Sequence, residues 1–458
     1  MTQHTGPSSF PTDPTEPQER GLTDSAAVRE RDEAGTRRPS GPAKGDAGRG
    51  SALVVTGSLL AGLVAALGLV LGPFAGDREA VITGAFLLGF AVGWALLAVL
   101  SERFTDRPQR WAAVPAAAMA LTGLGLVVLA PGDGALTALG WAWPPLLLAL
   151  VVWMIVQARR RPSGRAQSWL LYPVFGVLAL AATGGAYETV RNATDPAPAV
   201  LARSRLIDVG GHRLSIRCIG SGSPTVVLEP GLGETASAMA RWIAPNIART
   251  TTVCAYDRAG HGRSDDVPAA GADAARDLNV VLARAHVPRP YVLAGHSLGG
   301  MFALSYAHRF PAQVAGVVLL DSMHPRQHDA FAGTDRFLAV LPTLARMGVA
   351  RLLADPKDGR PTKQAAAFVR DVDDMPAQLD RAAKLTSLGN RPLSVLTAGT
   401  DAEPGWTGEQ NDLAKLSTDS THRTVGPATH QSLIDDKRYA AQSSRAIDDV
   451  VKAVQRSG

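Results

Sequence analysis

The distribution of apolar residues divides the chain into three parts with different structural requirements. Residues 1–50 carry few large apolar side chains and are rich in proline, glycine, serine, threonine and charge. Such a segment cannot bury enough surface to offset its loss of chain entropy, so we expect a disordered tail. Residues 51–190 are dominated by alanine, leucine, valine and glycine. Residues 205–458 alternate short apolar runs with amphipathic stretches, after an expected linker at 191–204.

The apolar region holds several runs that are long enough to cross a bilayer. About 20 apolar residues span the hydrocarbon core as a helix, and a helix satisfies its own backbone polar groups there. Charged residues are confined largely to the connections between the runs, which argues against the alternative of buried helices in a soluble core. The predicted membrane helices are 51–72, 80–100, 111–130, 138–157 and 167–187.

Basic residues in the connections predict the orientation of these helices. Arginine and lysine cluster in the tail and in the second and fourth connections, whereas the first connection has only Arg78 and the third has neither. Basic loops stay in the cytoplasm, so the N-terminus is expected there. Residues 166–187 carry no charge and are long enough to cross, so we expect five helices and the C-terminal domain outside the cytoplasm. The alternative is that 167–187 lies on the membrane surface and the domain is cytoplasmic. The net charge of +5 therefore indicates membrane orientation, and we expect no nucleic-acid partner.

From residue 205 onward the pattern predicts a sheet. Short runs rich in β-branched residues end in turn residues, and helical patterns separate most of them, which is typical of a mainly parallel α/β sheet. In such sheets ligands bind beyond the carboxyl ends of the strands. The predicted strands are "RLIDVG", "HRLSIRCIG", "PTVVLEPG", "TTVCAYDRAG", "PYVLAG", "VAGVVLLD", "PLSVLTAG" and "STHRTV".

One of these strands runs into "GHSLGG", which places Ser297 between Gly295 and Gly299. A serine nucleophile must be exposed and paired with a base. A sharp strand-to-helix turn exposes it, and glycine on both sides gives the turn room. The N–H groups at the start of the following helix favour developing negative charge. The alternative is a glycine-rich turn without chemistry.

Four segments carry a resemblance to a known family. "PGLGETASAMARW", "YDRAGHGRSD", "GHSLGG" and "GPATHQSLIDD" resemble motifs of the α/β-hydrolase fold family, in its order and approximate spacing. The resemblance covers 205–458, a little over half of the chain. It implies an α/β fold with a sheet of about eight strands, a Ser–acid–His triad and a helical cap, here at 324–390. An all-α membrane bundle precedes this domain.

The resemblance assigns candidate triad residues. Of ten histidines, His430 lies in a loop after the last predicted strand, where it could reach Ser297. Two acids remain open. Asp321 ends the sixth strand, and Asp401 follows the seventh, although Ala402 occupies the place where the family usually has the acid. We favour Asp321, with Asp401 as the alternative.

The resemblance also implies an oxyanion hole made of two main-chain N–H groups. Leu298, directly after the nucleophile, should supply one, and Leu232 the other. Many relatives have His-Gly before the second donor, whereas this chain has Pro230-Gly231.

Only two cysteines are present, Cys218 and Cys254, which excludes a cysteine-rich zinc or disulfide scaffold. The family's strand order makes their strands neighbours, so a disulfide is our hypothesis, and it would support an external domain. The alternative is two buried free thiols. We expect no metal and no cofactor.

The predicted function is therefore that of a membrane-anchored serine hydrolase. It would cleave a carboxylic ester, thioester or amide through an acyl-enzyme, acting on a small acyl substrate of lipid or cell-envelope origin. An aminopeptidase-like enzyme is the nearest alternative. A dehalogenase is disfavoured because that chemistry uses Asp where this chain has Ser297. An alternative of another class is a non-catalytic membrane receptor or scaffold.

Overall fold

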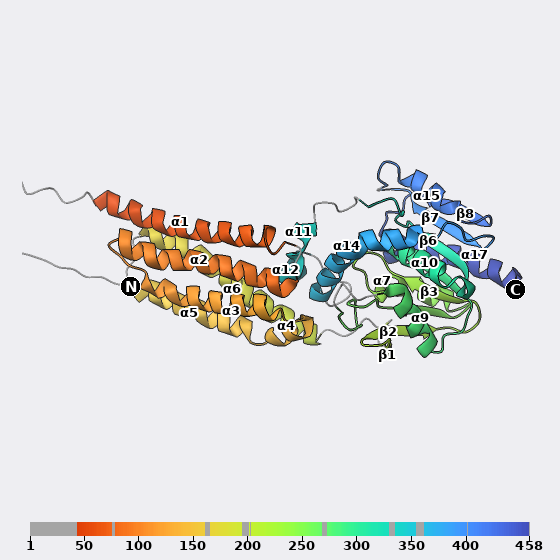
Figure 1. Cartoon of the computed structure of the whole chain (residues 1–458), viewed down its shortest axis with the longest axis horizontal. Helices are drawn as coiled ribbons and strands as arrows, with labels where there is room; N and C mark the ends of the chain where they lie inside the picture. The colour runs from red at the N-terminus through yellow and green to blue at the C-terminus, as the bar shows by residue number, and fades with distance from the viewer. Residues whose placement is uncertain are drawn as a thin grey trace, which may run out of the picture. The chain divides into compact units, whose positions relative to one another are not determined.

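The apolar region folds into helices in a computed structural model of the chain (Figure 1). The structure describes residues 44–75, 78–160, 165–194, 201, 203–267, 273–328, 335–353, 361–400 and 402–457. Residues 1–43 of the predicted tail lie outside the described residues. The chain divides into the units Met1–Lys44 and Gly45–Gly458, and the apolar helices and the sheet lie in the second. The first helices are α1 (Lys44–Leu71), α2 (Glu79–Phe104), η1 (Arg110–Ala112), α3 (Ala113–Leu129), α4 (Asp133–Leu139), α5 (Trp143–Arg160) and α6 (Arg165–Thr194).

Four spans among the described residues are long and apolar enough to cross a membrane: Gly50–Leu71, Glu79–Phe104, Arg110–Leu129 and Trp169–Thr194. A fifth exists only if α4 and α5, which meet at a bend of 46°, count as one span. The sequence also allowed a surface position for the last predicted helix, 167–187. By length and composition, 167–187 belongs to a helix that can cross a membrane. The predicted helix at 138–157 is the irregular one, because it includes the bend between α4 and α5.

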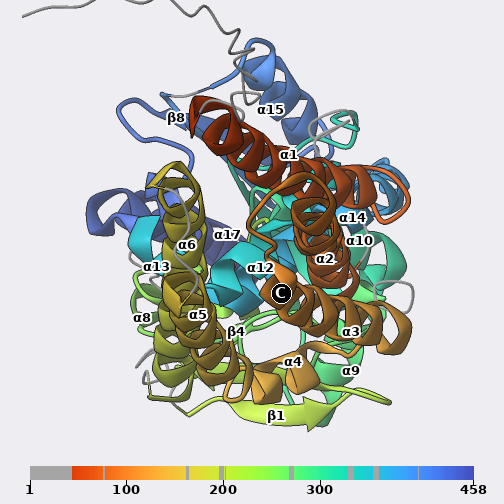
Figure 2. The same cartoon turned by 90° about the vertical axis from the view of Figure 1, so that its left-hand side faces the viewer.

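The outer surfaces of these helices are apolar. Among the described residues, the exposed large hydrophobic side chains all lie on α1–α6 or their connections, except for Leu206, Phe337 and Leu344. Figures 1 and 2 show α2, α3, α5 and α6 running side by side. Their smaller inner core contains Trp94, Trp111 and Phe175. Apolar surface that no protein covers is what a bilayer requires of its helices.

The second part of the chain forms one sheet of eight strands, in the order β1-β2-β4-β3-β5-β6-β7-β8. The pairs β1–β2 and β2–β4 are antiparallel and all other neighbours are parallel, as the alternation of strands and helices predicts. The strands are β1 (Arg205–Asp208), β2 (Arg213–Ile219), β3 (Thr225–Glu229), β4 (Val253–Tyr256), β5 (Tyr291–His296), β6 (Val314–Leu320), β7 (Leu393–Ala398) and β8 (Ser420–Val425).

Helices cover both faces of this sheet. Because successive strand residues point to opposite faces, Val227 and Leu293 join one core, and Val226 and Val292 join the other. The first core is closed by α9 (Ala274–Arg284) and α10 (Leu298–Arg309). The second core is closed by α7 (Ala236–Ala240), α8 (Ala244–Ile247), α16 (Ser432–Asp435) and α17 (Lys437–Ser457). The remaining elements are η4 (Pro311–Gln313) and α15 (Trp406–Ala414).

The connection from β6 to β7 is helical, as the resemblance implies. It contains α11 (Asp335–Leu338), α12 (Leu341–Arg346), α13 (Val349–Leu353) and α14 (Pro361–Ala383). We call these four helices the cap. In α14, Met375, Leu379 and Ala382 are buried in the core shared with α10. Two large apolar side chains of the cap, Phe337 and Leu344, are exposed.

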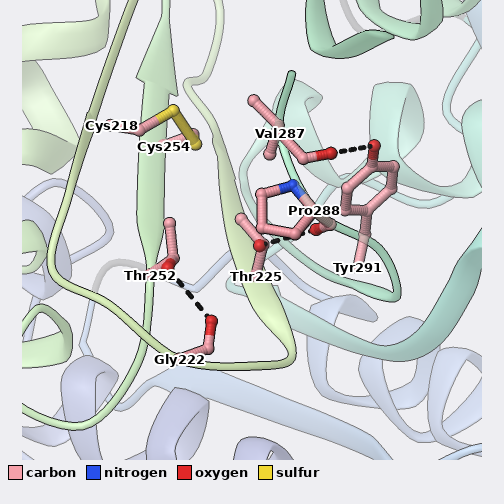
Figure 3. The surroundings of a disulfide bond; sticks show 8 residues. All are labelled: Cys218, Gly222, Thr225, Thr252, Cys254, Val287, Pro288 and Tyr291. Carbon is pink, nitrogen blue, oxygen red and sulfur yellow. Dashed lines mark hydrogen bonds between the residues drawn. A yellow bond between two sulfur atoms is a disulfide. The ribbon is translucent and has the colours of Figure 1, made fainter. Parts of the chain in front are cut away.

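Cys218 and Cys254 form a disulfide between β2 and β4 (Figure 3). The two residues are direct partners in the antiparallel register, with Cα atoms 4.0 Å apart. Nearby loops are tied to the same edge of the sheet, since Thr252 donates to Gly222 O and Thr225 donates to Pro288 O. The structure therefore has the bonded form of the pair rather than two free thiols.

Candidate active site

Ser297 lies at a strained turn between β5 and α10. Its φ of 55° and ψ of −126° belong to a backbone region that residues other than glycine rarely adopt. A Cβ atom on Gly295 would lie 2.5 Å from Gly299 O, and one on Gly299 would lie 2.1 Å from Glu229 O. Neither position has room for a side chain, so the glycines that flank Ser297 allow α10 to pack this closely. Strain of this kind is typical of functional residues.

His430 and Asp321 lie together at the same edge of the sheet. His430 follows β8, Asp321 follows β6, and His430 Nδ1 is 2.6 Å from Asp321 Oδ2. Because a carboxylate only accepts, the imidazole donates through Nδ1, which leaves Nε2 free to accept a proton. Asp321 also has a positive φ of 42°. The structure thus brings together two of the predicted residues; the alternative acid, Asp401, lies outside the described residues.

Further donors hold the carboxylate of Asp321. Its Oδ1 accepts from the Ala398 N–H at 3.0 Å and from Trp406 Nε1 at 2.7 Å. Burial raises the pKa of Asp321, but the hydrogen bonds from His430, Trp406 and Ala398 outweigh it, so the pKa lies below its usual value. Asp321 is therefore ionised at neutral pH and can keep His430 in one tautomer.

His296, the residue before Ser297, contacts His430. Its Nε2 lies 3.1 Å from His430 O, its Nδ1 lies 3.3 Å from Glu234 Oε2, and the two imidazole rings are 4.6 Å apart. Both partners are acceptors, so the cationic form of His296, in which both ring nitrogens donate, satisfies both contacts. Burial lowers the pKa of His296. The charge of Glu234 and its hydrogen bond to His296 raise the pKa by more, so the net shift is upward.

The loop after β3, Pro230–Glu234, lies beside Ser297. A Cβ atom on Gly231 would be 3.1 Å from Ser297 Cβ. The Gly231 N–H donates to Glu234 Oε2 at 2.6 Å, and Gln431 donates to Glu234 Oε1. Burial raises the pKa of Glu234, but His296 and these donors outweigh it and lower the pKa to about 2. The predicted oxyanion donors, Leu298 and Leu232, thus lie at the start of α10 and within this loop.

Several contributing residues were not predicted from the sequence. Trp406 contacts the predicted acid Asp321 across 85 positions, and Glu234 contacts His296 across 62 positions. No local pattern marks such pairs. Asp257, which follows β4, accepts from the Arg263 N–H within its own turn. It also accepts from the Ala236 N–H, which joins that turn to the start of α7.

Comparison with known proteins agrees with this architecture. A family model described as alpha/beta hydrolase fold matches residues 224–385. An uncharacterised protein of Mycobacterium tuberculosis is 34% identical over 140 residues, which cover 30% of this chain and 38% of that protein. A pimeloyl-[acyl-carrier protein] methyl ester esterase of Chromobacterium violaceum is 36% identical over 107 residues, covering 23% of this chain and 40% of that protein.

The chain spans about two fifths of the length of these curated relatives. Among solved structures, a thermophilic esterase from Thermogutta terrifontis matches with a TM-score of 0.41 and 19% identity. That match covers 55% of this chain and 99% of the esterase.

Proposed function

Because the C-terminal part of this chain belongs to the α/β-hydrolase fold family, we propose that it is a serine hydrolase that cleaves a carboxylic ester, thioester or amide. One observation carries the proposal. Ser297 lies on a strained turn, and its neighbour His296 contacts His430, which is paired with Asp321 at 2.6 Å. The relative from Chromobacterium violaceum is named as an ester hydrolase, which favours an ester among the three bonds.

In the acylation step, Ser297 Oγ attacks the carbonyl carbon and its proton passes to His430 Nε2. Asp321 stabilises the imidazolium that forms and does not itself take the proton. The carbonyl oxygen becomes an anion, which the main-chain N–H groups of Leu298 and Leu232 stabilise. Preorganised donors of this kind contribute about 3–4 kcal/mol each. The leaving group then takes the proton from His430 as the tetrahedral intermediate collapses.

In the deacylation step, water attacks the acyl-enzyme and His430 accepts its proton. The second tetrahedral intermediate uses the same two N–H groups, and its collapse returns the proton to Ser297 Oγ. Asp321 must remain ionised throughout, and its lowered pKa meets that requirement.

The apolar helices anchor this domain in a membrane in our proposal, with the domain outside the cytoplasm. Ion pairs made by two arginines of the cap support five crossings. Arg346 of the cap pairs with Glu79 at the start of α2 and with Asp133 at the start of α4. Arg351 of the cap pairs with Glu188 near the end of α6. The end of α6 therefore lies on the same side as the starts of α2 and α4, as five crossings require.

The disulfide also supports an external domain, since disulfides persist in oxidising compartments. A membrane anchor would place the site near acyl substrates of lipid or cell-envelope origin. The basic connections support a cytoplasmic N-terminus.

Hydrolysis of a p-nitrophenyl ester by the purified full chain in detergent tests the proposal. We expect turnover that Ser297→Ala reduces by at least about 1,000-fold and Asp321→Asn by a similar factor. The exposed pair Arg423–Asp449 offers a control, Asp449→Asn, which should leave turnover unchanged. Turnover of ester and amide probes separates an esterase from an aminopeptidase-like enzyme. Turnover that survives Ser297→Ala would contradict the proposal.

A further inference from the structure

A carboxylate from the cap reaches the loop beside the candidate nucleophile. Asp371 lies on α14, about 140 positions after that loop, and is 6% exposed. Its Oδ2 accepts from the Gly233 N–H at 2.8 Å and from Arg258 Nη2 at 2.8 Å, and it lies 3.0 Å from His261 Nε2. One oxygen atom of the cap thus binds three groups of the hydrolase domain.

Arg258 extends this contact to the first half of the loop. Its Nη1 donates to Pro230 O at 2.6 Å, and its Nη2 donates to Gly231 O at 2.8 Å. The Arg258 guanidinium is buried and lies 4.3 Å from the Phe302 ring of α10. The pair Asp371–Arg258 therefore holds main-chain groups on both sides of Leu232.

The opposite side of the loop is held by Glu234, which accepts from the Gly231 N–H. The main-chain groups around Leu232 thus have fixed partners. The Leu232 N–H itself has no hydrogen-bond acceptor within the described part of the chain. It is the group left available for a developing oxyanion.

From this arrangement we infer that Asp371 is a positioning residue that sets the Leu232 N–H for the transition state. The inference rests on the proposed function. Buried charged hydrogen bonds are strong, and removing one partner leaves the other without compensation. If Asp371 is neutralised, the acceptor shared by Arg258 and Gly233 loses its negative charge, their hydrogen bonds weaken and the loop can move. The cap then contributes to transition-state stabilisation as well as covering the site.

The variant Asp371→Asn tests this inference in the full-length protein in detergent, with a p-nitrophenyl ester as substrate. We expect kcat to fall by about 10- to 100-fold with KM changed less than about threefold, because the oxyanion contact is made mainly in the transition state. An alkyl boronic acid, which forms a tetrahedral adduct with Ser297, should lose affinity by the same factor as kcat/KM.

The matched control is Asp374→Asn. Asp374 lies on the same helix and pairs with Arg381 rather than with the loop. This variant should keep kcat and boronate affinity. If Asp371→Asn does not fold, Asp371→Glu keeps the charge but displaces the oxygen. We then expect smaller losses of kcat and of boronate affinity.

Two results would overturn the inference: unchanged kcat, or a lower kcat with unchanged boronate affinity. Failure of the proposed function is distinguishable, because the parent would then show no Ser297-dependent turnover. A fall in melting temperature alone, with kinetics intact, would show a purely structural role and contradict the inference.

Discussion

At the scale of single residues, two strained positions coincide with two of the predicted site residues. Ser297 and Asp321 are among four residues other than glycine with positive φ in the described chain. Strain costs stability, so it persists where surrounding contacts hold it. Here the Ser297 N–H donates to Leu320 O, and the Asp321 N–H donates to Leu396 O. Main-chain bonds to β6 and β7 therefore fix both residues.

A mild substitution at Trp406 can test the role of Asp321 as the acid of the triad. Trp406→Phe keeps the ring but removes the donor to Asp321 Oδ1, while the Ala398 N–H remains. We expect kcat to fall about 10-fold, since a hydrogen bond to a charged group contributes about 1.5 kcal/mol. The control Trp242→Phe removes a similar N–H donor, bonded to Asp435 O, and should leave kcat unchanged. Equal kinetics for both variants would contradict the assigned role of Asp321.

Glu229, at the end of β3, should make stability depend on pH. Burial raises its pKa from 4.5 to about 7, although Arg258 and the hydrogen bond from Tyr256 lower it. The folded state therefore binds the proton more tightly than the unfolded state. The associated stability is fully present below pH 4.5 and is lost as pH rises through about 7.

The variant Glu229→Gln removes this titration and retains an acceptor for Tyr256. We expect it to gain about 2 kcal/mol in free energy of unfolding relative to the parent between about pH 5 and about pH 8. Thermal unfolding at both pH values measures the gain. The exposed Glu403 supplies the control Glu403→Gln. A difference between parent and variant that does not change with pH would refute the assignment.

At the scale of elements, the disulfide joins two neighbouring antiparallel strands that are 36 positions apart. Closing a loop of this length in the unfolded chain stabilises the folded state by about 3–4 kcal/mol. Replacing both cysteines by serine should lower the melting temperature by about 5–10 °C. Alkylation of unreduced, denatured parent protein should find no free thiol. Two alkylated cysteines would contradict the bond.

The sequence was sufficient for the strands because their apolar runs end in clear turn residues. All eight predicted strands are present, and Ser297, Asp321 and His430 lie at the edge where parallel strands end. Contacts between distant elements could not be predicted. Asp371 and Trp406 act on residues more than 80 positions away, and nothing in their local sequence identifies those partners.

At the scale of the whole molecule, ion pairs join the cap of the hydrolase domain to the apolar helices of the N-terminal part. Arg346 and Arg351 pair with acidic residues at helix ends, and Thr362 donates to Glu188 at 3.1 Å. Glu188 is 1% exposed, so its contacts with Arg351 and Thr362 are buried. The cap that reaches the oxyanion loop through Asp371 therefore also contacts the helices assigned to the membrane.

The most direct test of this external serine hydrolase is labelling of intact cells with a membrane-impermeant fluorophosphonate. We predict labelling of the parent and none of Ser297→Ala, because only an activated serine outside the cytoplasm can react. Label that appears only after lysis, and still depends on Ser297, would contradict the external placement. No Ser297-dependent label in either preparation would contradict the central claim that this chain is a serine hydrolase.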